Sequence, residues 1–181
     1  MNQQDKLIRL TQNHAIKPFD CGDQSLNKFL FKEAKLSQTK LLSITYLLEN
    51  ETDTIAFFSL SNDKIGINEF GGTNLQKLRK KLGKPIEKTY KSYPSVKIGR
   101  LAVNVKYERK NIGTSLLDYL KVLFVTENRT GCAFITVDAY GQSLGFYQKN
   151  GFDYLTKNDE NLATRLLFYD LQQLVPIQQV S

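Results

Sequence analysis

The sequence carries at residues 145–152 the stretch Gly-Phe-Tyr-Gln-Lys-Asn-Gly-Phe, which decides the fold. An apolar run rich in β-forming residues precedes it at residues 133–138, so a strand is expected there. Residues 143–149 have the pattern of a short helix, and Asn150-Gly151 ends that helix. A last apolar strand is expected at residues 163–171. The stretch therefore belongs to a strand–helix–strand arrangement.

The chain before this stretch continues the same alternation. Residues 96–105 predict a strand, and residues 111–127 predict a long amphipathic helix. Residues 128–131 end this helix, with Gly131 suited to a left-handed capping position. Strands and helices that alternate in this order imply a parallel pairing of strands around the long helix.

The first half of the chain predicts a helix and an antiparallel hairpin. A short strand at residues 7–10 precedes a helix at residues 25–35, whose apolar residues recur at helical spacing. Residues 44–49 and 54–60 are two β-rich runs, and the polar residues 50–53 between them form a turn. The hairpin adds antiparallel strands, so the predicted fold class is α/β with a mixed sheet.

The loop that leads into the long helix has the features of an anion site. The first backbone N–H groups of a helix have no acceptor within the helix, and the helix dipole favours a negative charge beside them. Gly113 allows a phosphate to approach the backbone, and Asn111 tolerates dihedral angles that glycine would otherwise supply. The loop is neither a Walker loop nor a dinucleotide fingerprint. The side chains that can add positive charge or hydroxyl donors beside it are Arg109, Lys110, Thr114 and Ser115.

Together with this loop, the stretch at residues 145–152 resembles the motifs of the GNAT superfamily of N-acetyltransferases. The later motif of that family is written F-Y-x-x-x-G-F, and it is matched at every fixed position by Phe146, Tyr147, Gly151 and Phe152. The earlier, phosphate-binding motif is written R/Q-x-x-G-x-G/A. It is matched through Leu101-Ala102-Val103, Gly113 and the following Leu116-Leu117. Glu108 stands where the family usually has Arg or Gln, and Asn111 replaces the first glycine.

The resemblance implies the GNAT fold over one N-acetyltransferase domain at residues 1–181. This fold is a central mixed, mostly antiparallel sheet flanked by helices, with splayed central parallel strands that hold acetyl-CoA. The resemblance also implies acetyl-CoA as the co-substrate, no metal, and Tyr147 as the catalytic general acid that protonates the CoA thiolate. The implied acetyl-CoA-binding residues are Leu101, Ala102 and Val103 for the pantetheine arm, Arg109, Lys110, Asn111, Ile112, Gly113, Thr114 and Ser115 for the pyrophosphate, and Phe146.

Two further segments resemble the toxin branch of GNAT toxin–antitoxin systems. Residues 19–30 are similar to the opening helix of these toxins, and residues 98–103 are similar to another segment of the branch. This likeness implies that the chain acetylates the α-amine of aminoacyl-tRNA, blocks translation and has an antitoxin as partner. The alternative is a housekeeping N-acetyltransferase of a small amine, a peptide or a protein N-terminus. A third reading is a non-catalytic GNAT module that binds nucleic acid, and a homodimer is left open.

No residue stands out as a general base. His14 is the only histidine and lies outside both motifs, so we expect a surface or structural role for it. A weakly basic amine needs no strong base, and the ester bond of an aminoacyl-tRNA withdraws electrons and lowers the pKa of its α-amine. A lysine side chain is harder to deprotonate. The missing base therefore favours aminoacyl-tRNA as the acceptor.

The composition of the 181 residues fits a cytoplasmic protein with one core. The net charge of +7 attracts polyanions, which here means either a phosphorylated cofactor or nucleic acid. No run is long and apolar enough to span a membrane or to act as a signal peptide. Cys21 and Cys132 lie far apart, and we expect small core residues rather than a disulfide or a zinc site. The fold of residues 61–95, which carry a basic run and a short candidate helix at residues 75–82, is not predicted.

Overall fold

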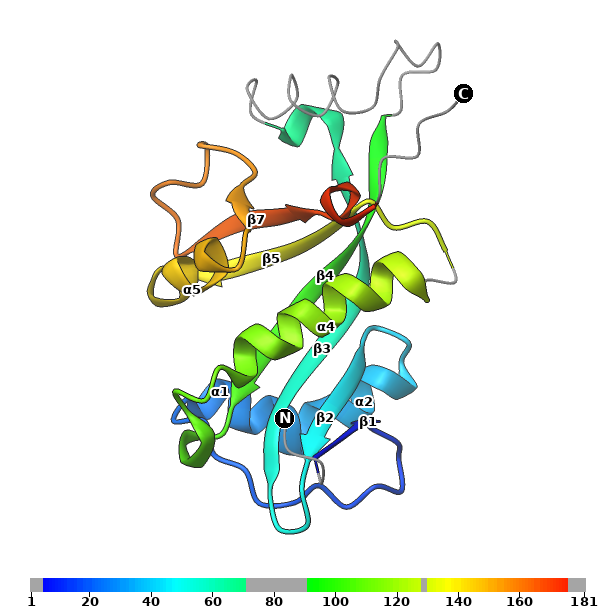
Figure 1. Ribbon diagram of the computed structural model, residues 1–181, viewed down its shortest axis with the longest axis vertical. Coiled ribbons are helices and arrows are strands. Elements are labelled where there is room, and N and C mark those ends of the chain that lie inside the picture. Colours follow the sequence, from blue (N-terminus) through cyan, green and yellow to red (C-terminus); the bar gives the residue numbers. More distant parts are fainter. Residues whose placement is uncertain (1–4, 71–90, 128–129, 176–181) are drawn as a thin grey trace. The chain divides into compact units, whose positions relative to one another are not determined.

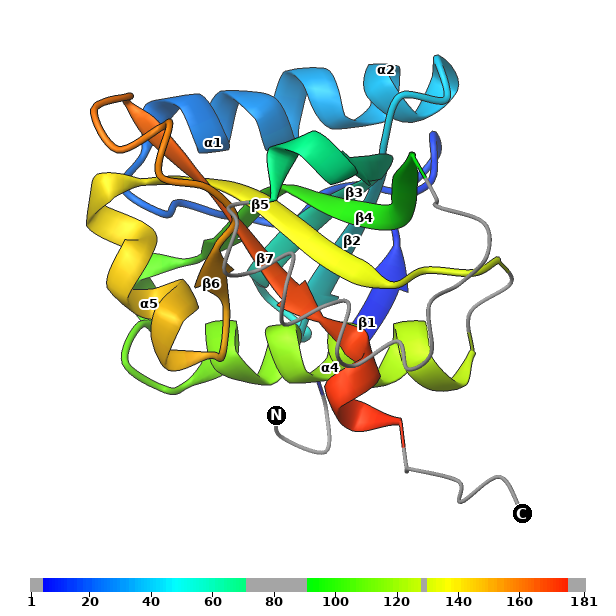
Figure 2. The same cartoon turned by 90° about the horizontal axis from the view of Figure 1, so that it is seen from above.

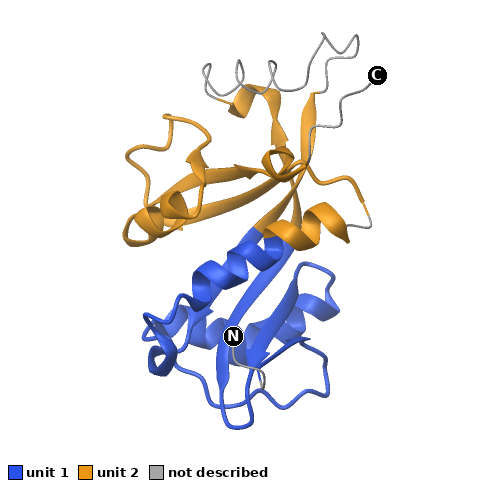
Figure 3. Ribbon diagram, in the orientation of Figure 1, with its two compact units in different colours: residues 1–61, 98–120 blue, residues 62–97, 121–181 orange. Residues whose placement is uncertain are grey.

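The computed structural model describes residues 5–70, 91–127 and 130–175. The chain divides into two compact units, which Figure 3 colours separately. The first unit comprises residues 1–61 and 98–120, and the second comprises residues 62–97 and 121–181. The predicted single domain over residues 1–181 stays a prediction.

In the described part of the chain, seven strands form one mixed sheet in the order β1-β2-β3-β4-β5-β7-β6. The pairs β1–β2, β2–β3, β5–β7 and β6–β7 are antiparallel, whereas β4 and β5 are parallel. The predicted α/β class with a mixed, mostly antiparallel sheet is therefore confirmed. The strands are β1 (Lys6–Arg9), β2 (Ile44–Glu49), β3 (Thr54–Gly66), β4 (Ser92–Val103), β5 (Phe134–Tyr140), β6 (Asp153–Tyr154) and β7 (Thr164–Asp170).

In the first unit, a run of three helical segments covers one face of strands β1 to β3, and the first part of α4 (Ile112–Thr126) covers the other (Figures 1 and 2). The run starts at α1 (Gln24–Lys28), continues through the π-helix η1 (Phe29–Glu33) and ends with α2 (Ala34–Thr39). Asp23 caps it, because its carboxylate accepts hydrogen bonds from the backbone N–H groups of Ser25 (2.8 Å) and Leu26 (3.1 Å). The predicted helix at residues 25–35 is confirmed and extends to Thr39.

The core of the first unit lies under this helical run. Apolar side chains from β1, β2, β3 and the helices meet there, and the Phe57 ring packs against Phe19 and Phe29 at centroid distances of 5.4 and 6.1 Å. Arg100 lies over the Phe29 ring, 5.3 Å from its centroid. Ala102 of β4 belongs to the same core, so the end of β4 is fixed by the packing of its buried face.

In the second unit, the long β5–β7 pair carries an aromatic core on one face. The register runs from Phe134 opposite Asp170 to Tyr140 opposite Thr164. Phe134 contacts the rings of Phe70 and Phe168 at centroid distances of 5.7 and 5.8 Å. The 3-10 helix η4 (Gly141–Ser143) and helix α5 (Leu144–Lys149) follow the end of β5.

Three details differ from the sequence-based predictions. Strand β3 runs on to Gly66 and β4 begins at Ser92, so part of the undeciphered stretch at residues 61–95 is strand. Gly131 does not have a positive φ, so the predicted left-handed cap at this residue is wrong. The candidate helix at residues 75–82 lies outside the described residues. No described helix is long and apolar enough to cross a membrane.

Candidate functional site

The loop before α4 has the backbone geometry of an anion site. Arg109 and Asn111 both take left-handed dihedrals, with φ of 59° and 58°, which confirms the expectation that Asn111 stands in for a glycine. The Ser115 N–H donates to the Asn111 carbonyl at 3.0 Å, one helical turn back. The N–H groups of residues 112–114 therefore precede the helical ladder and are available to a ligand oxygen.

The side chains of this loop are accessible and positively charged. Arg109, Lys110 and Asn111 are exposed, and residues 112–115 are partly exposed. The Lys110 ammonium lies 5.1 Å from the centroid of the Tyr107 ring, which gives it a defined position. Helix dipole, free N–H groups and two cations meet at one place, so the loop fits a pyrophosphate chemically.

The strand that leads into the loop presents its backbone in a fixed position. The Ala102 side chain is buried in the core of the first unit, so Leu101 and Val103 point to the opposite face of the strand. Asn104 ends the strand and is itself buried. Its N–H donates to the carbonyl of Ile55 at 2.8 Å, and its side-chain amide donates to the carbonyl of Thr54 at 3.1 Å. The predicted residues from Leu101 to Ser115 thus lie together in the first unit.

Phe146 and Tyr147 lie on α5 in the second unit, and the end of this helix explains the spacing of their motif. The N–H of Gly151 donates to the carbonyl of Gln148 at 3.0 Å, and the N–H of Phe152 donates to the carbonyl of Tyr147 at 3.1 Å. These two bonds, with a φ of 82° at Gly151, make a Schellman motif. The rings of Tyr147 and Phe152 complete it with an apolar contact at a centroid distance of 5.4 Å.

The motif holds the Tyr147 ring in a buried position. Phe146 contacts it at a centroid distance of 5.1 Å, and only 6% of Tyr147 is exposed. Burial raises the pKa of Tyr147 well above its ordinary value, because the phenolate form is poorly solvated there. The Tyr147 hydroxyl makes no hydrogen bond to any residue in the described part of the chain. Because its pKa is raised, the hydroxyl stays protonated at neutral pH, and its proton is not donated to another described residue.

The two cysteines and the histidine lie outside these features. Both thiols are free and half-buried rather than fully buried core residues. Burial raises the pKa of each thiol, which disfavours the thiolate that a covalent acyl-enzyme route would need. The His14 Nε2 lies 3.1 Å from a carboxylate oxygen of the buried Glu49, so His14 has the structural role expected for it.

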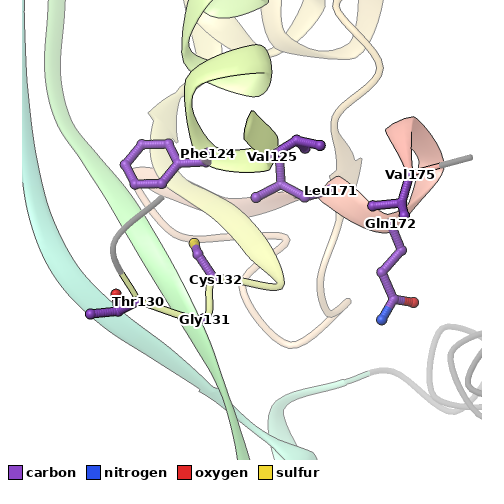
Figure 4. A pocket seen from close by; sticks show the side chains of 8 residues that line it. All are labelled: Phe124, Val125, Thr130, Gly131, Cys132, Leu171, Gln172 and Val175. Atoms are coloured by element: carbon purple, nitrogen blue, oxygen red, sulfur yellow. The ribbon is translucent and has the colours of Figure 1, made fainter. Parts of the chain in front are cut away.

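A cavity of about 400 Å³ lies in the second unit, and its lining includes no residue predicted to bind acetyl-CoA. Among the described residues that line it, none carries a charge, and Cys132 is one of them (Figure 4). Its lining residues are Phe124, Val125, Thr130, Gly131, Cys132, Leu171, Gln172 and Val175.

The sequence has a basic segment at residues 77–97, and most of it lies outside the described residues. Lys97 is described, and its ammonium forms an ion pair with Asp138. Within the described ranges, no group of three His, Cys, Asp or Glu side chains could hold a metal ion.

The sequence reasoning missed the contacts that hold the loop. Asp53, in the turn between β2 and β3, binds the side chains of Lys106 and Tyr107 just ahead of Arg109. A polar turn was expected at residues 50–53, but no local pattern links it to a loop more than 50 residues later.

Comparison with known protein families finds a match for the segment that contains both motifs. Residues 87–170 match the family model described as an acetyltransferase (GNAT) domain. This segment contains both predicted motifs, and the match supports N-acetyltransferase activity.

Solved structures share the fold over nearly the whole chain. A tyrosine-to-phenylalanine mutant of KacT is 25% identical, with a TM-score of 0.76 over 95% of this chain and 99% of KacT. AtaT complexed with acetyl-methionyl-tRNAfMet is 22% identical, with a TM-score of 0.75 over 94% of this chain and 96% of AtaT. An AtaT mutant toxin bound to the C-terminus of the antitoxin AtaR and to acetyl-CoA is 19% identical, with a TM-score of 0.70 over 95% and 96%. These likenesses confirm the predicted GNAT fold.

Proposed function

We propose, from the premise that residues 87–170 carry an acetyltransferase (GNAT) domain, that the chain transfers acetyl from acetyl-CoA to the α-amine of aminoacyl-tRNA. Such a modification blocks the amine on which peptide-bond formation depends, so the chain would act as a translation-inhibiting toxin. The choice of acceptor rests on one observation. The chain is similar over 94% of its length to AtaT, which was solved with acetyl-methionyl-tRNAfMet.

The loop and β4 supply the proposed donor site. Backbone groups of Leu101 to Val103 would hold the pantetheine arm, and the free N–H groups at the start of α4 would hold the pyrophosphate. Arg109 and Lys110 would neutralise the phosphates, while Thr114 and Ser115 would donate hydroxyl hydrogen bonds. The exposed cations and the left-handed Asn111 support these assignments. Phe146 would contact acetyl-CoA beside Tyr147.

The proposed reaction needs one proton donor and a neutral amine. The amine nitrogen attacks the thioester carbonyl carbon, the C–S bond breaks, and the CoA sulfur leaves with the bonding electron pair. Tyr147 gives its hydroxyl proton to that sulfur, and the amine loses a proton to water. The buried, protonated state of Tyr147 supports this role. His14 lies outside both motifs, and its Nε2 contacts the buried Glu49 carboxylate, so we assign it no part in the reaction.

The net charge of +7 supports a polyanionic acceptor, since phosphate backbones attract basic surfaces. The AtaT toxin bound to AtaR and acetyl-CoA supports an antitoxin as a further partner. A homodimer and a cytoplasmic location stay predictions. The second candidate, a housekeeping N-acetyltransferase of small amines or protein N-termini, follows from the same donor site, because a fold does not determine its acceptor.

One assay separates these acceptors. The purified chain receives acetyl-CoA with a labelled acetyl group, together with either a pool of charged tRNA or a panel of amines and peptides. We expect label in the aminoacyl-tRNA fraction, and none when the same tRNA has first been deacylated. Label on free amines with none on charged tRNA would replace the toxin with the housekeeping enzyme. Binding of tRNA without any transfer would favour the non-catalytic module.

A further inference from the structure

The turn between β2 and β3 is tied to the proposed pyrophosphate loop by a buried carboxylate. Asp53 is 8% exposed, and each of its carboxylate oxygens has a donor from the segment just before the loop. The Lys106 ammonium lies 2.9 Å from Oδ1, and the Tyr107 hydroxyl donates to Oδ2 at 3.0 Å. Both partners belong to the 3-10 helix η3 (Val105–Tyr107).

The turn that carries Asp53 is held by hydrogen bonds between its own residues. The side-chain oxygen of Asn50 accepts hydrogen bonds from the N–H groups of Thr52 (2.9 Å) and Asp53 (2.8 Å). The Asn50 side-chain amide donates to the Tyr107 hydroxyl at 2.8 Å. Tyr107 is therefore held by two side chains of one turn, and its hydroxyl has both a donor and an acceptor.

The contacts lead from Asp53 to a cation of the loop. Asp53 fixes the Tyr107 hydroxyl, and the ring of Tyr107 lies under the Lys110 ammonium at 5.1 Å. Arg109 and Asn111, on either side of Lys110, have left-handed dihedrals that cost a non-glycine residue energy. Such a loop keeps its shape only if its surroundings hold it. The Asn50–Asp53 turn binds the side chains of η3, and the Asp20 carbonyl accepts a hydrogen bond from the Val105 N–H at 2.8 Å.

We infer that Asp53 is a positioning residue that sets the pyrophosphate loop, and with it the affinity for acetyl-CoA, without touching the reacting atoms. The inference rests on the proposed function of the loop. The Lys106 hydrogen bond keeps the pKa of the Asp53 carboxyl below its usual value, so the carboxylate persists through the neutral range. A purely structural role for Asp53 would instead affect folding and leave the affinity of the folded chain unchanged.

The chain offers a matched control in the same hairpin. Glu49, the last residue of β2, is 4% exposed, and its carboxylate accepts a hydrogen bond from the Thr54 hydroxyl at 2.8 Å. Its other close partners in the described chain are His14 and Lys17. Glu49→Gln therefore removes a buried carboxylate from this hairpin without changing a contact to η3.

The experiment measures acetyl-CoA binding by calorimetry, and steady-state kcat and KM, on the full chain. We expect Asp53→Asn to raise the Kd and KM for acetyl-CoA about tenfold, with kcat and the acceptor KM unchanged. Tyr107→Phe keeps the ring under Lys110 and loses only the hydroxyl, so about a threefold rise is expected. Glu49→Gln is expected to lower the melting temperature and leave the Kd unchanged. Tyr107→Phe also provides the test if Asp53→Asn fails to fold.

A second acetyl donor distinguishes a shifted pyrophosphate loop from a general loss of activity in Asp53→Asn. S-acetylpantetheine has the reactive thioester but no pyrophosphate, so Asp53→Asn should leave its KM unchanged. An equal rise in KM for both donors, or an unchanged Kd for acetyl-CoA in both loop variants, would overturn the inference while the proposed function stands. No binding of acetyl-CoA to the wild-type chain would overturn the proposed function of the loop and this inference with it.

Discussion

The start of α4 and the end of α5 are two helix termini with left-handed residues beside them, and they treat their unpaired backbone groups differently. At the start of α4 the chain takes left-handed dihedrals at Arg109 and Asn111, neither of which is a glycine. At the end of α5 the left-handed position is Gly151. The first terminus leaves backbone N–H groups free for a ligand, whereas the second satisfies its carbonyls within the motif. The loop at the start of α4 depends on contacts with a distant turn, whereas the end of α5, which fixes a side chain, is built from consecutive residues.

The largest expected effect concerns the side chain that the α5 terminus holds. Tyr147→Phe removes the proposed proton donor and keeps the buried ring, so kcat should fall about 100-fold or more. The Tyr147 hydroxyl has no hydrogen-bond partner among the described residues, so the free energy of unfolding at pH 7 should change by less than about 1 kcal/mol. Kinetics and urea titration of the same preparation measure both. A wild-type kcat in this variant would remove Tyr147 from the chemistry.

The second prediction concerns a substitution that disrupts the Schellman motif at the end of α5. Gly151→Ala forces a left-handed alanine, and the added Cβ would lie 3.1 Å from the Tyr169 ring. We expect the free energy of unfolding to fall by about 1–2 kcal/mol, together with a loss of kcat as Tyr147 shifts. Gly145→Ala is the control in the same helix, because its Cβ would meet no atom within 4 Å. Alanine favours helix interiors over glycine, so this control should be neutral or stabilising by about 0.5–1 kcal/mol. Equal effects of the two changes would contradict the role of Gly151.

The two termini differ in how much of their structure could be predicted from the sequence. The Schellman motif joins Tyr147, Gly151 and Phe152 within six residues, so a short consecutive pattern was enough to predict the short helix and its end. The role of Tyr147 came from the resemblance to the GNAT motif and stays a prediction. The α4 loop was predicted as an anion site from Gly113 and its cations. Its fixation by Asp53 was not, because the two segments meet only through the tertiary fold. Gly131 was mistaken for a left-handed cap, since a glycine after a helix permits that conformation without requiring it.

The third prediction uses pH to measure the burial of Tyr147. Its pKa in the folded chain is raised above the value of about 10 expected in the unfolded chain. Below pH 10 both states are protonated and the contribution is complete. Above pH 10 the unfolded state loses the proton first, so the free energy of unfolding falls by up to about 1.4 kcal/mol per pH unit.

The measurement is the difference in unfolding free energy between wild type and Tyr147→Phe at pH 8, 10 and 11. The variant should lose less stability as the pH rises. Tyr140→Phe serves as the control because Tyr140 is 62% exposed, and it should follow the wild type. Parallel curves for wild type and Tyr147→Phe would show that the Tyr147 hydroxyl is solvated.

The smallest expected effect concerns Asn111, the left-handed residue at the start of α4. Asn111 has a φ of 58°, which asparagine tolerates better than most residues, so Asn111→Ala should cost about 1 kcal/mol of unfolding free energy. Asn111→Gly restores the residue that this backbone prefers, and it should recover most of that loss, offset by the greater flexibility of the unfolded chain. Urea titration measures both variants, and acetyl-CoA calorimetry follows the loop. If alanine and glycine destabilise equally, the dihedral angle is not what selects Asn111, and its side chain must contribute through a contact of its own. If only alanine destabilises, the α4 loop obeys the same backbone rule as Gly151, with asparagine in place of glycine.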